Sequence, residues 1–202
     1  MATALELTTL IPSDPKDAER IATRGQKPLE IVEYRPEWPA KFAEVERRIR
    51  QALGDRAVLV QHVGSTSVPG LAAKDIIDID VAVSDPSDEA SYVPDLEAAG
   101  FKFLIREPKW YQHRLFHFET PYTNLHVFGA DSPEVVRHRM FRDWLRDHAD
   151  DRDRYTAVKR EAAAASRAAG EVTDQYNLRK EPVIMDILRR MFEAQGLLDR
   201  QT

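Results

Sequence analysis

The chain has 202 residues, a formal net charge of −5, 43% hydrophobic residues and no cysteine. This length suits one domain with a helical appendage, and the acidic balance argues against general nucleic-acid binding. The absence of cysteine excludes disulfides, thiolate metal sites and a cysteine nucleophile. No apolar run is long enough to span a bilayer and the N-terminus lacks a secretory pattern, so we expect a cytoplasmic protein without membrane contact.

The first part of the chain predicts an arm, a strand and a helix. Residues 1–28 mix Thr, Pro, Asp, Lys and Gly without periodicity, which predicts a flexible N-terminal arm. Alternating apolar and charged residues predict a strand over 29–34. From Trp38 to Leu53 apolar residues recur at spacings of three and four, which indicates an amphipathic helix.

The middle of the chain alternates between strand and helix patterns. The Asp85-Pro86 step predicts the start of a helix that ends near Gly100. Runs rich in apolar residues predict five more strands, the last two joined as a hairpin. These strands are expected over 58–63, 76–83, 101–105, 111–119 and 124–128.

The remainder is helical in pattern, beginning at the Ser132-Pro133-Glu134 start signal. The sequence therefore predicts an α/β (α+β) fold, in which a mixed β-sheet flanked by helices is followed by a helical C-terminal section. We expect the flexible arm over 1–28, the sheet domain over 29–131, and the helical section packed on it over 132–202.

Two aspartates share one face of the strand predicted over 76–83. Because strand side chains alternate, Asp78 and Asp80 point the same way, with Cα atoms roughly 6.5 Å apart. Two carboxylates on an otherwise apolar strand repel each other and lose hydration, and a cation relieves both costs. Mg²⁺ prefers one or two carboxylates plus substrate phosphates. The pair therefore predicts a site for Mg²⁺ or Mn²⁺.

The turn before this strand, Gly64-Ser65-Thr66, supplies the other half of such a site. Glycine lets backbone approach a ligand closely, and backbone amides attract phosphate. In isolation each feature has an ordinary explanation, because an aspartate pair also occurs at a solvent-facing strand edge and Gly-Ser-Thr also forms simple turns. In strand–turn–strand order the two together favour a site for phosphate and metal.

Gly-Ser on a turn, followed by Asp-apolar-Asp on the next strand, resembles the nucleotidyltransferase superfamily. The longer phrase HVGSTSVPGL at 62–71 resembles the GrpB family of that superfamily, over about Glu30 to Phe192. That family also occurs fused to dephospho-CoA kinase in some bacteria. The resemblance implies a nucleotidyltransferase-like sheet, with ATP or another nucleoside triphosphate as substrate. Asp75 departs from the family pattern, which commonly has proline there, and adds a negative charge beside the site.

Catalytically complete nucleotidyltransferases carry a third carboxylate on a later strand. The inward position expected for it is His126, and a histidine there resembles the GrpB pattern. A neutral imidazole accepts a proton or binds a metal, but it also serves as a hydrogen-bonded core residue. Glu119, at the end of the preceding strand, is the alternative carboxylate.

Lysines and tyrosines add candidates for binding phosphate. Tyr155 and Lys159 share one helical face, and Tyr176 and Lys180 repeat the spacing. In polymerase-like nucleotidyltransferases a Lys and a Tyr or Ser from the helical section hold the triphosphate, and these pairs resemble that arrangement. The alternative is a surface helix whose lysines reach solvent. Lys74, just before the aspartate strand, is a further candidate.

Three functions follow from these patterns. The first is a metal-dependent nucleotidyltransferase that moves a nucleoside monophosphate from a triphosphate to a small-molecule acceptor, with Asp78 and Asp80 on the metal and His126 near the acceptor. The second is an ATP-dependent ligase that adenylates a carboxylate before amine attack. The third is a nucleotide-binding module without catalysis, which the missing third carboxylate favours.

Overall fold

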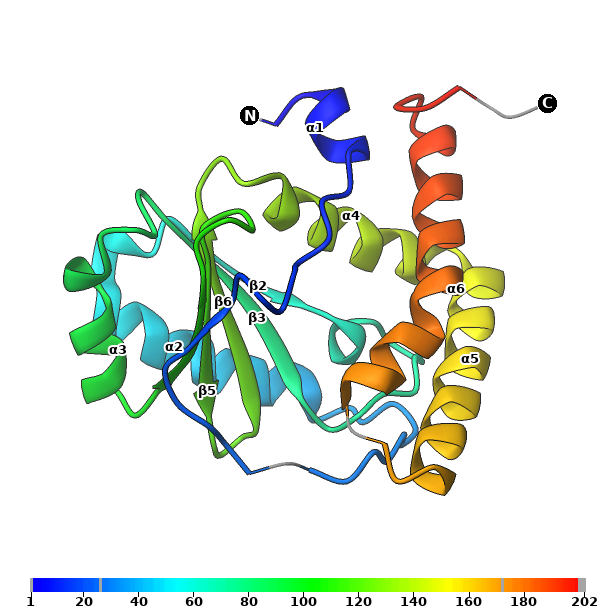
Figure 1. The fold of residues 1–202 in the computed structure, drawn as a ribbon, viewed down its shortest axis with the longest axis horizontal. Coiled ribbons are helices and arrows are strands. Elements are labelled where there is room, and N and C mark those ends of the chain that lie inside the picture. Colours follow the sequence, from blue (N-terminus) through cyan, green and yellow to red (C-terminus); the bar gives the residue numbers. More distant parts are fainter. Residues whose placement is uncertain (1, 26, 172, 200–202) are drawn as a thin grey trace.

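The computed structural model describes residues 2–25, 27–171 and 173–199. Its centre is a six-stranded mixed sheet with the order β1-β4-β5-β6-β3-β2 (Figure 1). β3 and β6 are parallel, and all other neighbouring strands are antiparallel. The strands are β1 Glu19–Arg20, β2 Leu59–Val63, β3 Ile77–Val83, β4 Lys102–Glu107, β5 His113–Phe118 and β6 Thr123–Gly129. This is the α+β sheet predicted from the sequence.

Helices cover both faces of the sheet and form the C-terminal part. They are α1 Ala4–Thr8, α2 Trp38–Leu53, α3 Val93–Ala98, α4 Pro133–Asp147, α5 Ala149–Ala168 and α6 Thr173–Ala194. Within the described ranges, no helix combines the length and the apolar character needed to traverse a bilayer. Residues 1 and 26 of the expected arm, and 172 and 200–202 of the expected helical section, lie outside the described residues.

One face of the sheet carries the main hydrophobic core, against α2 and α3 (Figure 1). The odd-numbered residues of β3 and β6, such as Ile79 and Leu125, are fully buried there with Trp38 and Leu96 of the two helices. Because side chains alternate along a strand, the even-numbered residues of β3 and β6 face the opposite side. Asp78, Asp80, Asn124 and His126 therefore share one face.

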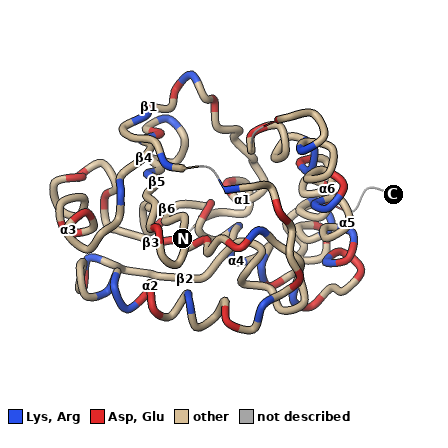
Figure 2. Tube along the Cα trace, turned by 90° about the horizontal axis from the view of Figure 1, so that it is seen from below, with Lys and Arg blue, Asp and Glu red and all other residues tan. Residues whose placement is uncertain are grey.

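That opposite face is bordered by the C-terminal helices. α4 passes beside β2, while α5 and α6 pack side by side at one end of the sheet (Figure 1). A second hydrophobic cluster joins the three helices to the loop after β2, through Leu71, Leu145, Tyr155 and Ile187. In the view of Figure 2, segments of both charge signs are interspersed along α2.

The segment expected to be a flexible arm makes specific contacts. α1 begins at a capping box, in which the side chains of Thr3 and Glu6 each accept a hydrogen bond from the other's backbone amide. The guanidinium of Arg137 in α4 donates to the carbonyls of Glu6 and Leu7. Further along, β1 pairs with β4 and becomes the edge strand of the sheet.

The strand predicted over 29–34 is wrong. Among the described residues it is reduced to a single bridge between Val32 and Ala73. Its apolar residues serve a different contact, because Leu29 and Ile31 pack against Ala163 and Tyr176 of α5 and α6. The alternation of apolar and charged residues over 29–34 therefore arises from packing against α5 and α6, and not from membership of the β-sheet.

The helix predicted from Asp85 to Gly100 is wrong in its first half. α3 begins only at Val93, after a 3₁₀ turn over Glu89–Ser91. Tyr92, the residue just before α3, has a non-helical backbone with φ −141°, and its hydroxyl donates to the carbonyl of Pro86 at 2.7 Å. This hydrogen bond joins the two ends of the loop over 86–92, and the helix begins after it.

Candidate functional site

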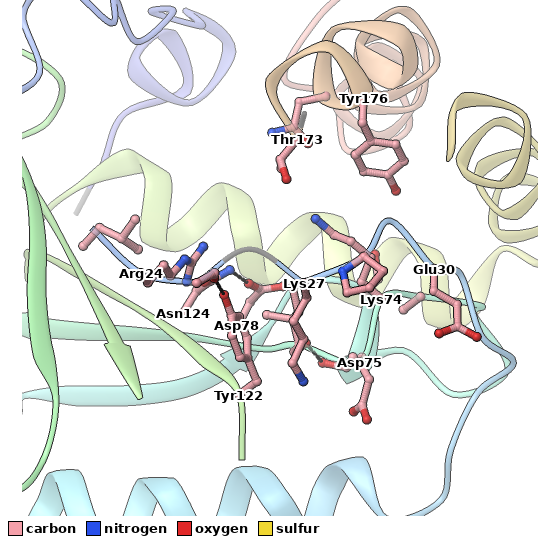
Figure 3. Close-up of a pocket in the computed structure, with 18 of the residues that line it drawn as sticks. Arg24, Lys27, Glu30, Lys74, Asp75, Asp78, Tyr122, Asn124, Thr173 and Tyr176 are labelled. Atoms are coloured by element: carbon pink, nitrogen blue, oxygen red, sulfur yellow. Dashed lines mark hydrogen bonds between the residues drawn. The ribbon is translucent and has the colours of Figure 1, made fainter. Parts of the chain in front are cut away.

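A cavity of 740 Å³ lies on the polar face of the sheet. Asp78, Asn124 and His126 of β3 and β6 line one side, and Tyr176 and Lys180 from the first turns of α6 line another. In Figure 3 Tyr176 descends from the helix toward the sheet residues. Residues 20, 22–25 and 27–28 supply a further wall. This volume is typical of small-molecule sites.

The charge of the cavity differs from that of the whole chain. Its lining contains seven Lys and Arg residues and four Asp and Glu residues, whereas the chain has 29 and 34. A cleft with surplus positive charge attracts anions. The cations are Arg20, Arg24, Lys27, Arg35, Lys74, Lys159 and Lys180.

Asp78 lies directly against the turn at Gly64. A Cβ atom at position 64 would lie 2.8 Å from Cβ of Asp78 and 2.9 Å from its Cγ, closer than real Cβ contacts. Gly64 also has φ +65° and ψ −173°, a conformation that is essentially restricted to glycine. The glycine before Ser65 is therefore required both by the backbone and by the carboxylate.

The carboxylate of Asp78 has little compensation for its burial. Nδ2 of Asn124 donates to it at 2.6 Å, from the paired position on β6. Burial raises the pKa of Asp78, although the bond from Asn124 and the charges of Lys74 and Lys180 oppose the rise. A perturbed carboxylate beside a cavity is typical of a functional site.

Asp80 points to the same face of β3 but lies beneath the cavity, outside its lining. Its side chain is fully buried, and it accepts a hydrogen bond from Nε2 of Gln61 at 3.1 Å. Nδ1 of His138 in α4 lies 2.9 Å from the same carboxylate. Burial opposes protonation of His138, but the charge of Asp80 raises the pKa of His138 to about 9. Asp80 is thus paired with an imidazolium.

Two ammonium groups lie close to the ring of Tyr176. Nζ of Lys180 lies 4.9 Å from the ring centroid and Nζ of Lys74 lies 5.1 Å from it. Neither lysine forms an ion pair with a residue that the structure describes. Burial, and then repulsion from Lys180, lowers the pKa of Lys74 to about 8. An anion between these groups would relieve their repulsion.

The other Tyr/Lys pair is divided between cavity and core. Lys159 lines the cavity and donates from Nζ to the carbonyl of Ala72. Burial, and then the charge of Lys180, lowers the pKa of Lys159 well below its usual range. Tyr155 is outside the lining and packs with Leu71 in the second hydrophobic cluster. This pair therefore brings its lysine, but not its tyrosine, to the cavity.

Some residues around the Gly64 turn line the cavity, and others hold the turn in place. Ser65 and Thr66 line the cavity, but the hydroxyl of Thr66 donates to the carbonyl of Ile76 at 3.1 Å. Nε2 of His62 lies 3.0 Å from the same hydroxyl. Burial, and then the charges of two nearby arginines, lowers the pKa of His62 to about 4, so its ring is neutral. Thr66 and His62 thus anchor the turn to β3.

The carboxylates suit magnesium better than a metal that needs several protein ligands. In the described part of the chain, no three His, Cys, Asp or Glu side chains converge as a metal-binding group. Mg²⁺ takes one or two carboxylates and completes its shell with phosphate and water. Asp78 meets this requirement at the cavity, with Asp80 next on the same strand face.

Two acidic residues singled out in the sequence have other partners. Asp75 is compensated by Arg35 at 2.9 Å, by Lys41 at 3.1 Å and by the indole Nε1–H of Trp38 at 2.8 Å. Glu119, outside the cavity lining, pairs with His117 at 2.8 Å.

The sequence interpretation missed three residues of the site. Asn124 lies two positions before His126, so strand alternation was a sufficient signal for it. Arg24, whose guanidinium donates to Asn124, comes from a segment without periodicity. His138 lies on the helix face that meets Asp80. Neither Arg24 nor His138 carried a local signal.

The chain is thus an α+β protein with a mixed sheet and a polar, cation-rich cavity on one face of that sheet. A sequence model of the family described as "GrpB protein" matches residues 28–190. The chain belongs to the GrpB family. A crystal structure of conserved protein GrpB from Enterococcus faecalis is similar, with a TM-score of 0.71 and 26% identity, over 83% of this chain and 99% of that chain.

Curated relatives agree with this assignment. A UPF0157 protein of Halalkalibacterium halodurans is 42% identical over 183 residues, covering 89% of this chain and 92% of that protein. A protein named dephospho-CoA kinase from Mycolicibacterium paratuberculosis is 33% identical over 204 residues. That match covers 87% of this chain but 49% of the kinase. This chain therefore corresponds to about half of that longer protein.

Proposed function

We propose that the chain binds a nucleoside triphosphate, ATP first, in this cavity and transfers its nucleoside monophosphate to a small-molecule acceptor with Mg²⁺ or Mn²⁺. The observation that carries the proposal is the surroundings of Asp78. Its carboxylate lies against the Gly64 turn and shares a cavity with Lys74 and Lys180, two lysines without an ion-pair partner among the described residues. Phosphate complements the lysines, and a divalent ion bound with that phosphate would complement Asp78.

In this proposal each side chain has a separate task. Lys74, Lys180 and the hydroxyl of Ser65 bind phosphate oxygens. Asp78 would hold the metal ion, while Asp80 keeps its pair with His138 beneath the cavity. When bound, such an ion would supply positive charge against the pyrophosphate leaving group. The acceptor oxygen forms a bond to the α-phosphorus while the bond from that phosphorus to pyrophosphate breaks. The proton of the acceptor goes to His126.

Two other functions share the same cavity. An adenylating ligase has the same first step on a carboxylate, followed by attack of an amine and release of AMP. A nucleotide-binding module without catalysis is favoured by one observation, the pairing of Asp80 with His138, which occupies the second carboxylate. The relatives named dephospho-CoA kinase support a nucleotide-related role for all three.

Release of pyrophosphate from ATP, with Mg²⁺ and a panel of alcohols, phosphates, carboxylates and amines, tests the proposal. We expect release that depends on one acceptor class, with the nucleotide remaining on the product. AMP release with a joined product would identify a ligase. Lys180→Ala should abolish turnover, whereas Arg179→Ala should preserve it, because Arg179 is the adjacent cation on α6 and pairs with Glu171 outside the cavity. ATP binding without turnover of any acceptor would favour the non-catalytic module.

A further inference from the structure

A row of polar side chains leads from the cavity into the sheet. Oε2 of Glu107, at the end of β4, lies 2.6 Å from Nδ1 of His113 on β5. Nε2 of His113 lies 3.0 Å from Nδ1 of His126 on β6. His126 lines the cavity, whereas His113 is only 3% exposed and stacks on Phe128. The row thus connects a partly buried carboxylate to the cavity through two imidazoles.

The partners determine where the protons lie. Burial opposes ionisation of Glu107, but hydrogen bonds from His113 and Ser13 lower the pKa of Glu107, so it is a carboxylate that only accepts. Nδ1 of His113 must therefore donate. Burial lowers the pKa of His113 despite the charge of Glu107, so its ring is neutral and its Nε2 accepts. Nδ1 of His126 must then donate, which leaves Nε2 of His126 without a proton.

We propose that Glu107, acting through His113, holds His126 in the tautomer with its proton on Nδ1, so that the lone pair on Nε2 is available at the cavity to take the proton of the acceptor. Glu107 and His113 are positioning residues, because they reach the cavity only through His126. The role assigned to the lone pair rests on the proposed function. The tautomer itself does not.

The surroundings of His126 suit a proton acceptor. Burial, and then the neighbouring His113, His138 and Arg24, lowers the pKa of His126 well below its usual range, so the free ring is neutral. When Nε2 takes the acceptor proton, positive charge develops on His126. Its Nδ1–H then points along the row toward the carboxylate of Glu107, which stabilises that charge, as the carboxylate of a catalytic triad does.

This row also accounts for the third carboxylate that the strand pattern lacks. Glu107 supplies the negative charge from β4, two side chains away from the cavity, and the two histidines connect it to the position where a carboxylate was expected. A purely structural role would need the row only to satisfy buried polar groups. It would not require one particular nitrogen of His126 to stay free.

Long-range ¹H–¹⁵N correlation spectra of the ¹⁵N-histidine-labelled chain test the inference. In the wild type at neutral pH we expect the His126 ring to show a protonated Nδ1 and an unprotonated Nε2. Glu107→Leu removes the acceptor at the end of the row, so the proton of His126 should appear on Nε2 in a substantial fraction of molecules. Glu107→Gln keeps the size of the side chain and should give a smaller change in the same direction if Glu107→Leu does not fold.

Glu119→Gln is the matched control. It alters another glutamate–histidine pair of the same sheet, with His117, that makes no hydrogen bond to His126 within the described chain. The tautomer of His126 should not change in this variant. A wild-type Nε2 that carries the proton, or a folded Glu107 variant with an unchanged tautomer, would overturn the proposal.

The same variants separate this inference from the proposed function. With an acceptor in hand, Glu107→Gln should lower kcat by about tenfold or more and leave the KM for ATP unchanged. If the tautomer behaves as expected but the wild type does not bind ATP, the proposed function fails and the positioning of His126 stands. If ATP is turned over equally well by wild type and Glu107→Gln, the role of the row in catalysis is refuted.

Discussion

The carboxylate of Asp78 occupies the space that a side chain at position 64 would fill. A Cβ added to Gly64 would meet Cβ of Asp78 at 2.8 Å, and the backbone of Gly64 has φ +65°. The Gly64 turn and the aspartate strand are therefore one unit, because the strand residue can reach the cavity only if the turn residue has no side chain. The glycine of the turn and the aspartate of the strand are thus linked by one steric requirement, the absence of a Cβ atom at position 64.

Gly64→Ala should displace Asp78 and abolish nucleotide binding, in addition to destabilising the fold by about 1–3 kcal/mol through backbone strain. Gly54→Ala is the matched control, since Gly54 also has a positive φ, of 55°, but has no atom within 4 Å of an added Cβ. Thermal unfolding and ATP titration of both variants check this. Equal losses of stability with ATP binding retained in Gly64→Ala would contradict the proposed contact.

The two aspartates should respond differently to the same substitution. Burial raises the pKa of Asp78, so its ionised form is costly, and Asp78→Asn should keep or raise the melting temperature while removing Mg²⁺-dependent ATP affinity. Asp80→Asn leaves His138 and Gln61 with a weaker partner and should lower the stability by about 1–3 kcal/mol. Calorimetry and thermal unfolding measure both. Equal changes in melting temperature and in ATP affinity for the two variants would contradict the different surroundings of Asp78 and Asp80.

Anion binding should weaken in mild alkali. The pKa of Lys74 is lowered to about 8, so the side chain is charged below that pH and neutral above it. ATP affinity should therefore fall between pH 7 and pH 9, by up to about tenfold. Lys74→Arg, which stays charged over this range, is the comparison. A wild-type Kd that does not change with pH would place Lys74 away from the bound phosphate.

His62 should make the fold sensitive to acid. Its pKa is lowered from 6.5 to about 4, because the buried ring resists protonation in the folded state. Below pH 6.5 His62 is protonated in the unfolded chain but not in the folded chain. The free energy of unfolding therefore falls between pH 6.5 and about pH 4, by on the order of 3 kcal/mol. His62→Gln should lose this part of the pH dependence in chemical denaturation. An unaltered pH profile in the variant would refute the assignment.

Much of the fold followed from local patterns. The strands that became β2 to β6 and the long helices carry strong periodicity, so their positions were predictable from side-chain alternation and spacing. β1 was not predictable, since two exposed residues, Glu19 and Arg20, join the sheet by pairing with β4 alone. The strand expected over 29–34 failed because its apolar residues pack against helices that lie far away in the sequence.

In the candidate site, too, some residues were predictable from local pattern and others were not. Residues on one strand face, such as Asp78 and His126, were predictable because alternation aims them at a common side. The difference between Asp78 and Asp80 was not, because it depends on where α4 brings His138. Glu107 and the wall that contains Arg24 come from other parts of the chain, and only tertiary packing brings them to the site.

Isothermal titration of ATP into the chain, with and without Mg²⁺, tests the central claim most directly, namely that the cavity around Asp78 binds a nucleotide through its unpaired lysines. The wild type should bind one ATP, more tightly with Mg²⁺, and Lys180→Ala should weaken binding by about tenfold or more, as expected for loss of a charged hydrogen bond. Arg179→Ala should bind as the wild type does. Absence of ATP binding by the wild type, or equal binding by Lys180→Ala and Arg179→Ala, would contradict the claim.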